Sequence, residues 1–211
     1  MRKLFYAPIV HTTADMGSQA EALEREHVRR HGRGEWARSR RLIDEVWERL
    51  RTHIFALDLE YRRVRIYQDG LPVCGRELDI VREVAQGGSR NYALILELLQ
   101  RGAVVEGTES PDLLRQEYEH IRSALTKESA PTRTGELGAG ESERLLRERD
   151  EFIGRRVGES LKEGEVGILF IGLMHQVDRF LPRDIQVQYL IHRLPFHIPP
   201  GEPGQRRGHD G

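Results

Sequence analysis

The sequence predicts an α/β fold: a mostly parallel sheet of about five strands, flanked by helices on both faces. Short apolar segments alternate with long amphipathic stretches, which is typical of strands joined by helical crossovers. Two segments, KLFYAPIVH (3–11) and EVGILFIGLMHQV (165–177), are nearly continuous apolar runs, as the central strands of a parallel sheet must be. With 211 residues, the chain is long enough for one such domain and too short for two large ones.

The first part of the chain predicts one strand and two helices. Residues 3–11 form the expected first strand. Ser18 and Glu21 have the spacing of a capping box, so a helix is expected from residue 18 to the HGRG break at 31–34. A second helix is expected over 35–53, because apolar residues recur there at helical spacing: Trp36, Ile43, Val46, Trp47 and Leu50.

The middle of the chain alternates strands with helices. RVRIYQDG (63–70) is the expected second strand, closed by an Asp-Gly turn. Helices are expected over 76–85 and 90–101, with a QGGS break between them. AVVEGTE (103–109) is a short third strand, and a Ser-Pro start opens the next helix, which continues to about residue 127.

The last part of the chain supplies the two remaining strands. Residues 128–141 contain almost nothing to bury and predict a flexible loop, followed by a charged helix over 142–162. The apolar segment at 165–177 is the fourth strand, and DIQVQYLI (184–191) is the fifth. Residues 198–211 predict a disordered tail, so the expected organisation is a single α/β domain over 1–197.

Composition excludes several classes of protein. The 33 Lys and Arg residues balance 34 Asp and Glu, and the net charge of −1 argues against a general nucleic-acid binder. Cys74 is the one cysteine, so an intramolecular disulfide and a cysteine-based zinc site are excluded. No run approaches the roughly 18 apolar residues of a spanning helix, and the N-terminal apolar segment is too short for a signal peptide. The expected location is the cytoplasm, with no membrane partner.

Polar side chains follow four of the predicted strands where those strands end. They are His11 after the first, Asp69 after the second, Glu106 and Glu109 after the third, and His175 after the fourth. The carboxyl ends of parallel strands meet at one edge of a sheet, which is where such sheets bind ligands. Imidazole and carboxylate together suit Zn, Mn, Fe or Co, and without a metal they suit general acid and base catalysis.

Each of these residues also has an ordinary structural interpretation. Asp69 before Gly70 is a turn former, Glu109 suits the start of a helix, and a histidine at a strand end is often simply hydrogen-bonded. The GGSRN segment (87–91) is expected to cap a helix, because it lacks the spacing and the lysine of a phosphate-binding loop.

The helix over 142–162 adds two features. Arg149 and Asp150 lie in its middle, and such a pair near the sheet would orient a carboxylate or hold an anionic ligand. Gly154 and Gly158 weaken a helix unless close packing requires them, so they predict a tight approach to the sheet.

Four motifs together resemble one superfamily. They are PIVH ending at His11, the acidic YQDG and VVEGTE, RDEFI starting at Arg149, and GLMH ending at His175. This arrangement is similar to that of the TraB, Tiki, erythromycin esterase-like and ChaN-like proteins. Two positions depart from it, since Pro8 stands where a glycine is usual and the second strand offers Gln-Asp in place of a clear glutamate. The Tiki branch implies metal-dependent peptide hydrolysis, the esterase-like branch lactone hydrolysis, and the ChaN-like branch haem binding.

The predicted function is a metal-dependent hydrolase of peptide or ester bonds, acting on a small molecule or a peptide at the strand ends. His11, Glu106 and His175 are the predicted ligands of a divalent metal ion, and Asp69 is the predicted base for its water. Arg149 would stabilise negative charge, with Glu109 and Asp150 completing the site. Two alternatives stay open, a non-catalytic small-molecule or haem-binding sensor on the same scaffold and an assembly protein with charged helices.

Overall fold

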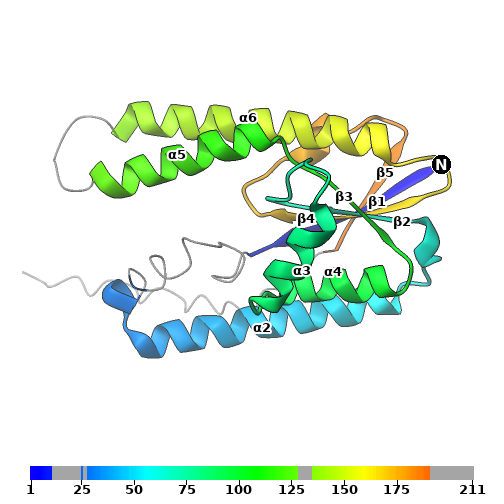
Figure 1. Cartoon of the computed structure of the whole chain (residues 1–211), viewed down its shortest axis with the longest axis horizontal. Helices are drawn as coiled ribbons and strands as arrows, with labels where there is room; N and C mark the ends of the chain where they lie inside the picture. The colour runs from blue at the N-terminus through cyan, green and yellow to red at the C-terminus, as the bar shows by residue number, and fades with distance from the viewer. Residues whose placement is uncertain (11–24, 26–27, 128–134, 191–211) are drawn as a thin grey trace, which may run out of the picture.

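The computed structural model describes residues 1–10, 25, 28–127 and 135–190 (Figure 1). Its sheet has five strands in the order β3-β2-β4-β1-β5, and every neighbouring pair is parallel. The predicted fold class is therefore confirmed. The strands are β1 (Arg2–Ile9), β2 (Val64–Gln68), β3 (Val104–Glu106), β4 (Val166–Gly172) and β5 (Ile185–Tyr189).

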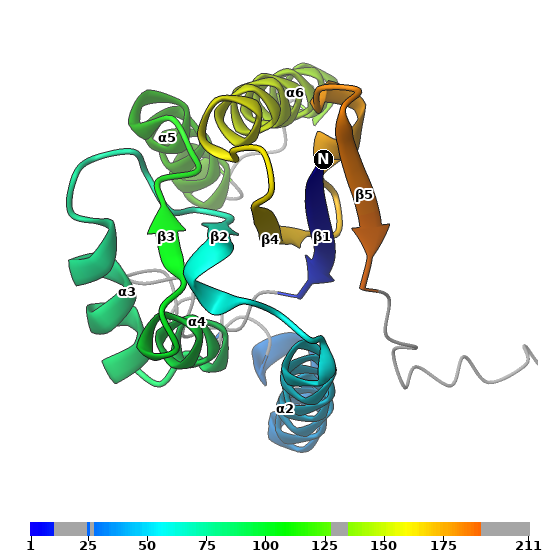
Figure 2. The ribbon, with the colours of Figure 1, turned by 90° about the vertical axis from the view of Figure 1, so that its right-hand side faces the viewer.

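Helices cover both faces of this sheet (Figure 2). One face carries α5 (Pro111–Lys127) and α6 (Gly135–Ser160), which pack together as a pair. The other carries α2 (Arg33–Ala56), α3 (Glu77–Gln86) and α4 (Arg90–Gln100). The described residues also form two short 3₁₀ helices, η2 (Tyr61–Arg63) and η3 (Val177–Phe180). None of the described helices is both long enough and apolar enough to cross a membrane.

Strand β4 lies in the middle of the sheet, and both of its faces are apolar. It pairs with β1 on one side and β2 on the other. Ile168 and Phe170 enter the core beneath α2 and α4, whereas Leu169 and Ile171 enter the core beneath α6. Successive side chains point to opposite faces of a strand, so a continuous apolar run is what a strand covered on both faces needs.

Two expectations about the elements change. The last long helix begins at Gly135, so residues 135–141 are helical although a loop was expected over 128–141. Of the helix expected from residue 18 to the HGRG break, residues 25 and 28–31 are described and are helical, whereas the tail expected over 198–211 lies outside the described residues. The third strand covers only Val104–Glu106 of the seven residues expected, because the chain turns after Glu106 toward α5.

The glycines of α6 do mark close packing, but not against the sheet. A Cβ atom at Gly154 would lie 2.7 Å from the Cβ of Phe180, and one at Gly158 would lie 2.7 Å from Cγ of Pro182. Both contacts are with η3 and the residues just after it. These glycines therefore hold α6 against the segment that follows β4, which places the middle of α6 beside the end of that strand.

Candidate active site at the strand ends

Asp69 connects the ends of two neighbouring strands. Its backbone N–H donates to the carbonyl of Phe170 at 2.9 Å, which continues the β2–β4 ladder one residue beyond β2. Its Oδ2 accepts a hydrogen bond from the backbone N–H of Gly172, also at 2.9 Å. The carboxylate is buried at the point where β4 ends, which is more than a turn former requires.

Arg149 forms hydrogen bonds with three carboxylates from three separate parts of the chain. Its Nε and Nη2 donate to both oxygens of Glu109, at 3.0 and 2.5 Å. Nη2 also donates to Oδ1 of Asp69 at 2.8 Å, and Nη1 donates to Glu117 of α5 at 2.5 Å. The Glu109 side chain is fully buried and that of Arg149 is 5% exposed. Bidentate arginine–carboxylate pairing of this kind fixes both partners in one geometry.

His175 lies between two carboxylates. Its Nδ1 is 2.6 Å from Oδ1 of Asp150, and its Nε2 is 3.5 Å from Oδ2 of Asp69. Asp150 is held in turn by the backbone N–H of Gln176, at 2.8 Å. A carboxylate hydrogen-bonded to one ring nitrogen fixes the orientation of a histidine and leaves the other nitrogen for chemistry. Nε2 of His175 therefore faces Asp69.

The rim cluster, defined as Asp69, Glu109, Arg149, Asp150 and His175, carries an excess of negative charge. Burial raises the pKa of Glu109 and the nearby Asp69 charge raises it further, although the hydrogen bonds from Arg149 act in the opposite direction. Burial alone would lower the pKa of His175, but the hydrogen bond to Asp150 and the charge of Asp69 outweigh it, so the pKa is raised. The rim cluster thus favours the protonated, cationic form of the His175 imidazole.

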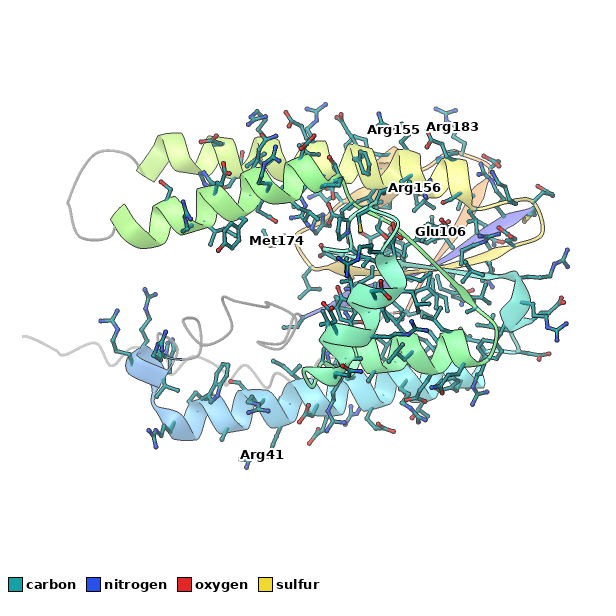
Figure 3. All side chains as sticks on the ribbon, viewed as in Figure 1. Arg41, Glu106, Arg155, Arg156, Met174 and Arg183 are labelled. Atoms are coloured by element: carbon teal, nitrogen blue, oxygen red, sulfur yellow. The ribbon has the colours of Figure 1, made fainter. Side chains whose placement is uncertain are left out.

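Glu106 belongs to a different group of charges. Arg65 donates to one of its oxygens at 2.6 Å and Arg156 to the other at 3.2 Å. Arg65 also pairs with Glu165 at 2.8 Å. We call these four residues the edge network, and Figure 3 shows Glu106 beside Arg156 on the side of the molecule where α6 ends. Both oxygens of the predicted metal ligand Glu106 are therefore engaged by arginines.

The structure brings together five of the seven site residues predicted from the sequence, namely the whole rim cluster. Glu106 joins the edge network, and His11 lies outside the described residues. Within the described ranges, no group of three or more His, Cys, Asp or Glu residues is arranged to hold a metal ion. The ligand set of His11, Glu106 and His175 stays a prediction.

Glu117 is a member of the site that sequence analysis missed. It contacts Arg149 from α5, and its side chain is 34% exposed. Nothing in the sequence distinguishes it from the other acidic residues of that helix, because its role depends on how α5 packs beside α6.

The loop after β4 exposes apolar side chains next to the buried histidine. Leu173 and Met174 are 56% and 75% exposed. Figure 3 shows Met174 beyond the strand ends, on the side toward which α2 and α6 extend. Two exposed apolar side chains therefore come directly before His175 in the chain.

Comparison of the chain with protein-family models, with curated proteins and with solved structures finds no match. The resemblance to the TraB and Tiki superfamily therefore stays a prediction.

Proposed function

We propose that the protein is a metal-dependent hydrolase of peptide or ester bonds, with His175 and Asp69 as ligands of the ion. The observation that most supports this proposal is that His175 contacts Asp150 through Nδ1 and Asp69 through Nε2. A metal-binding histidine usually donates its other ring N–H to a carboxylate, which is the position of Asp150.

The distance between the two proposed ligand atoms fits such an ion. Nε2 of His175 and Oδ2 of Asp69 are 3.5 Å apart. Nitrogen and oxygen ligands about 2.1 Å from one ion at a tetrahedral angle lie about 3.4 Å apart. The excess of buried carboxylates over cations supports the same proposal, since a divalent cation would offset it.

The remaining residues of the rim cluster position the ligands. Asp150 fixes the ring of His175, and Arg149 fixes the carboxylates of Asp69 and Glu109. The hydrogen bonds of Arg149 are directed at these carboxylates and at Glu117, so we assign it positioning in place of the anion binding expected from the sequence. The bound ion would supply Lewis acidity toward a carbonyl group and a water molecule of lowered pKa.

The test combines metal analysis with hydrolysis assays. Purified protein should bind about one Zn²⁺, Mn²⁺ or Co²⁺ ion and hydrolyse members of a panel of peptide anilides, aryl esters and lactones. His175→Ala should lose both the ion and the activity, whereas His53→Ala, at an exposed histidine of α2, should keep them. Asp150→Asn should weaken metal binding by about 10- to 100-fold while the fold is retained.

Two outcomes would reject this function. One is a folded His175→Ala protein that retains a stoichiometric ion and full activity. The other is a wild-type protein that hydrolyses no member of the panel but gives a haem absorbance band lost in His175→Ala, which would establish the non-catalytic alternative.

A further inference from the structure

Strand β3 forms one edge of the sheet, and within the described residues it pairs with β2 alone. Its other edge therefore directs backbone N–H and C=O groups away from the sheet. Exposed edges of this kind are usually protected by charged side chains, by proline or by a bulge. The single charged residue of β3 is Glu106, and its carboxylate is hydrogen-bonded to Arg65 and Arg156. The remaining edge residues, Val104 and Val105, are apolar and leave this edge open to pairing.

A groove of about 640 Å³ lies beside this edge, and we call it the β3 groove. It is lined by β3, by the start of α3 and by the second half of α4, and Figure 2 shows α3 beside β3 at that end of the row of strands. Its volume is within the roughly 300–1,000 Å³ of ligand-binding pockets. Its apolar lining comes from all three elements, as Leu78, Leu96, Leu99, Val104 and Val105. Leu78 and Val104 are exposed, so the β3 groove presents apolar surface to the solvent.

The walls of the β3 groove are fixed by the core. Leu96, Leu99 and Val105 pack against the core beneath α2 and α4. Helices α3 and α4 pack against each other, and the GGSRN segment between them caps α4 as expected, because Oγ of Ser89 accepts a hydrogen bond from the backbone N–H of Tyr92 at 3.1 Å. A preformed groove binds a ligand without the cost of ordering its own walls.

Two arginines that line the β3 groove keep hydrogen-bond donors for a ligand. Nε of Arg76 and Nη1 of Arg82 lie 3.6 and 3.8 Å from the carboxylate of Asp79. Both distances exceed the approximately 2.7–3.2 Å of an N–H···O hydrogen bond. Glu77, the other carboxylate of the lining, accepts hydrogen bonds from two backbone N–H groups of the loop before α3, at 2.8 and 3.0 Å. The exposed guanidinium groups are therefore suited to an incoming carboxylate.

We propose that the β3 groove binds an extended peptide segment of a partner protein. The segment adds a strand to the open edge of β3, places an apolar side chain against Leu96 and Leu99, and directs a carboxylate to Arg76 or Arg82. Backbone hydrogen bonds supply affinity, and the two side chains supply specificity. Because α3 and α4 cover the face of the sheet opposite α6, this interaction does not depend on the rim cluster or on the proposed function.

Shape and charge both favour a separate segment over a second copy of this chain. In a two-fold dimer the same surface lies on both subunits, so one concave groove would face another. Arg76 and Arg82 would also approach their own copies, and like charges in an interface are repulsive. An extended acidic segment meets neither obstacle.

Selection from a displayed library of linear heptapeptides tests this interaction. Peptides enriched on the full chain should share an apolar residue with Asp or Glu nearby. Leu78→Ser should bind a synthetic copy of an enriched peptide about tenfold more weakly. Leu173→Ser, at an exposed leucine that does not line the groove, should bind it as the wild type does. No enrichment over the Leu78→Ser protein, or equal affinity of Leu78→Ser and wild type, would overturn the proposal.

Modified peptides separate strand addition from simple apolar binding. N-methylation of one peptide bond at a time should abolish binding at alternate positions, because alternate N–H groups of an added strand point toward its neighbour. N-methylation that is harmless at every position would reject pairing with β3.

Exchanging the carboxylate of the peptide for its amide tests the two arginines. The exchange should weaken binding to the wild type and to Arg115→Gln, at an exposed arginine of α5, but not to the double variant Arg76→Gln/Arg82→Gln. Equal losses in all three proteins would reject the role of these arginines. Analytical ultracentrifugation gives the last check, since a dimer that Leu78→Ser dissociates would assign the groove to a second copy and overturn the proposal.

Discussion

The rim cluster and the edge network are both built from arginines and carboxylates around the same helix, yet they differ in burial and in balance. The edge network pairs two arginines with two glutamates, and its side chains are 15–28% exposed. The rim cluster has three carboxylates against Arg149 and a histidine, and its side chains are at most 5% exposed. The edge network is balanced in charge and partly exposed, whereas the buried excess of negative charge in the rim cluster is destabilising unless a cation offsets it.

The largest expected effect tests how much the rim cluster depends on its one arginine. Arg149→Met should lower the free energy of unfolding by about 3–5 kcal/mol, because Asp69 and Glu109 would be left buried without their charge partner. Urea denaturation monitored by circular dichroism measures this. Arg147→Met, at a side chain that is 74% exposed on the same helix, should change stability by less than about 1 kcal/mol. Equal effects of the two substitutions would show that the rim cluster does not depend on Arg149 as its charge partner.

A smaller effect tests the packing that holds α6 beside both groups. Gly154→Ala should cost about 1–3 kcal/mol, because its Cβ would lie 2.8 Å from the carbonyl oxygen of Phe180. Gly140→Ala on the same helix has open space around the new Cβ and should stabilise the protein by about 0.5–1 kcal/mol. Thermal unfolding of the two variants measures whether each substitution lowers or raises the stability. A stabilising Gly154→Ala would show that α6 can move away from η3.

The smallest effect concerns the edge network and its dependence on pH. Burial would raise the pKa of Glu165, but hydrogen bonds from Arg65 and from the backbone N–H of Lys162 outweigh it, so the pKa is lowered. A lowered carboxyl pKa contributes stability above the unfolded value of about 4.3 and loses it as pH falls through the folded value. Glu165→Gln should therefore cost about 1 kcal/mol at pH 7.

The same difference should disappear in acid. Urea denaturation between pH 7 and pH 3 should show the wild type and Glu165→Gln converging below about pH 4. Glu159→Gln, at an exposed residue of α6, should track the wild type throughout. A gap between wild type and Glu165→Gln that widens toward low pH would contradict the role given to the edge network.

Much of the candidate site follows from strand ends alone. Asp69 and His175 follow the ends of two predicted strands, and the rule that ligands bind at the carboxyl ends of parallel strands was enough to bring them together. The same rule could not separate Glu106 from Glu109. These residues are three apart on one short segment, yet Glu106 lies opposite Tyr67 in the β2–β3 register, whereas Glu109 lies beyond the strand and reaches Arg149.

The sequence by itself determined the order of strands and helices, because apolar periodicity is a local property that each segment carries independently. It also determined that β1 and β4 are central, since only buried strands are apolar on both faces. Only the tertiary structure decided which charges meet. Arg149 finds Asp69, Glu109 and Glu117 because α6 packs beside α5 and across the end of β2, and these contacts join residues 32 to 80 positions apart. Long-range pairing of this kind depends on register and helix packing, which no short segment encodes.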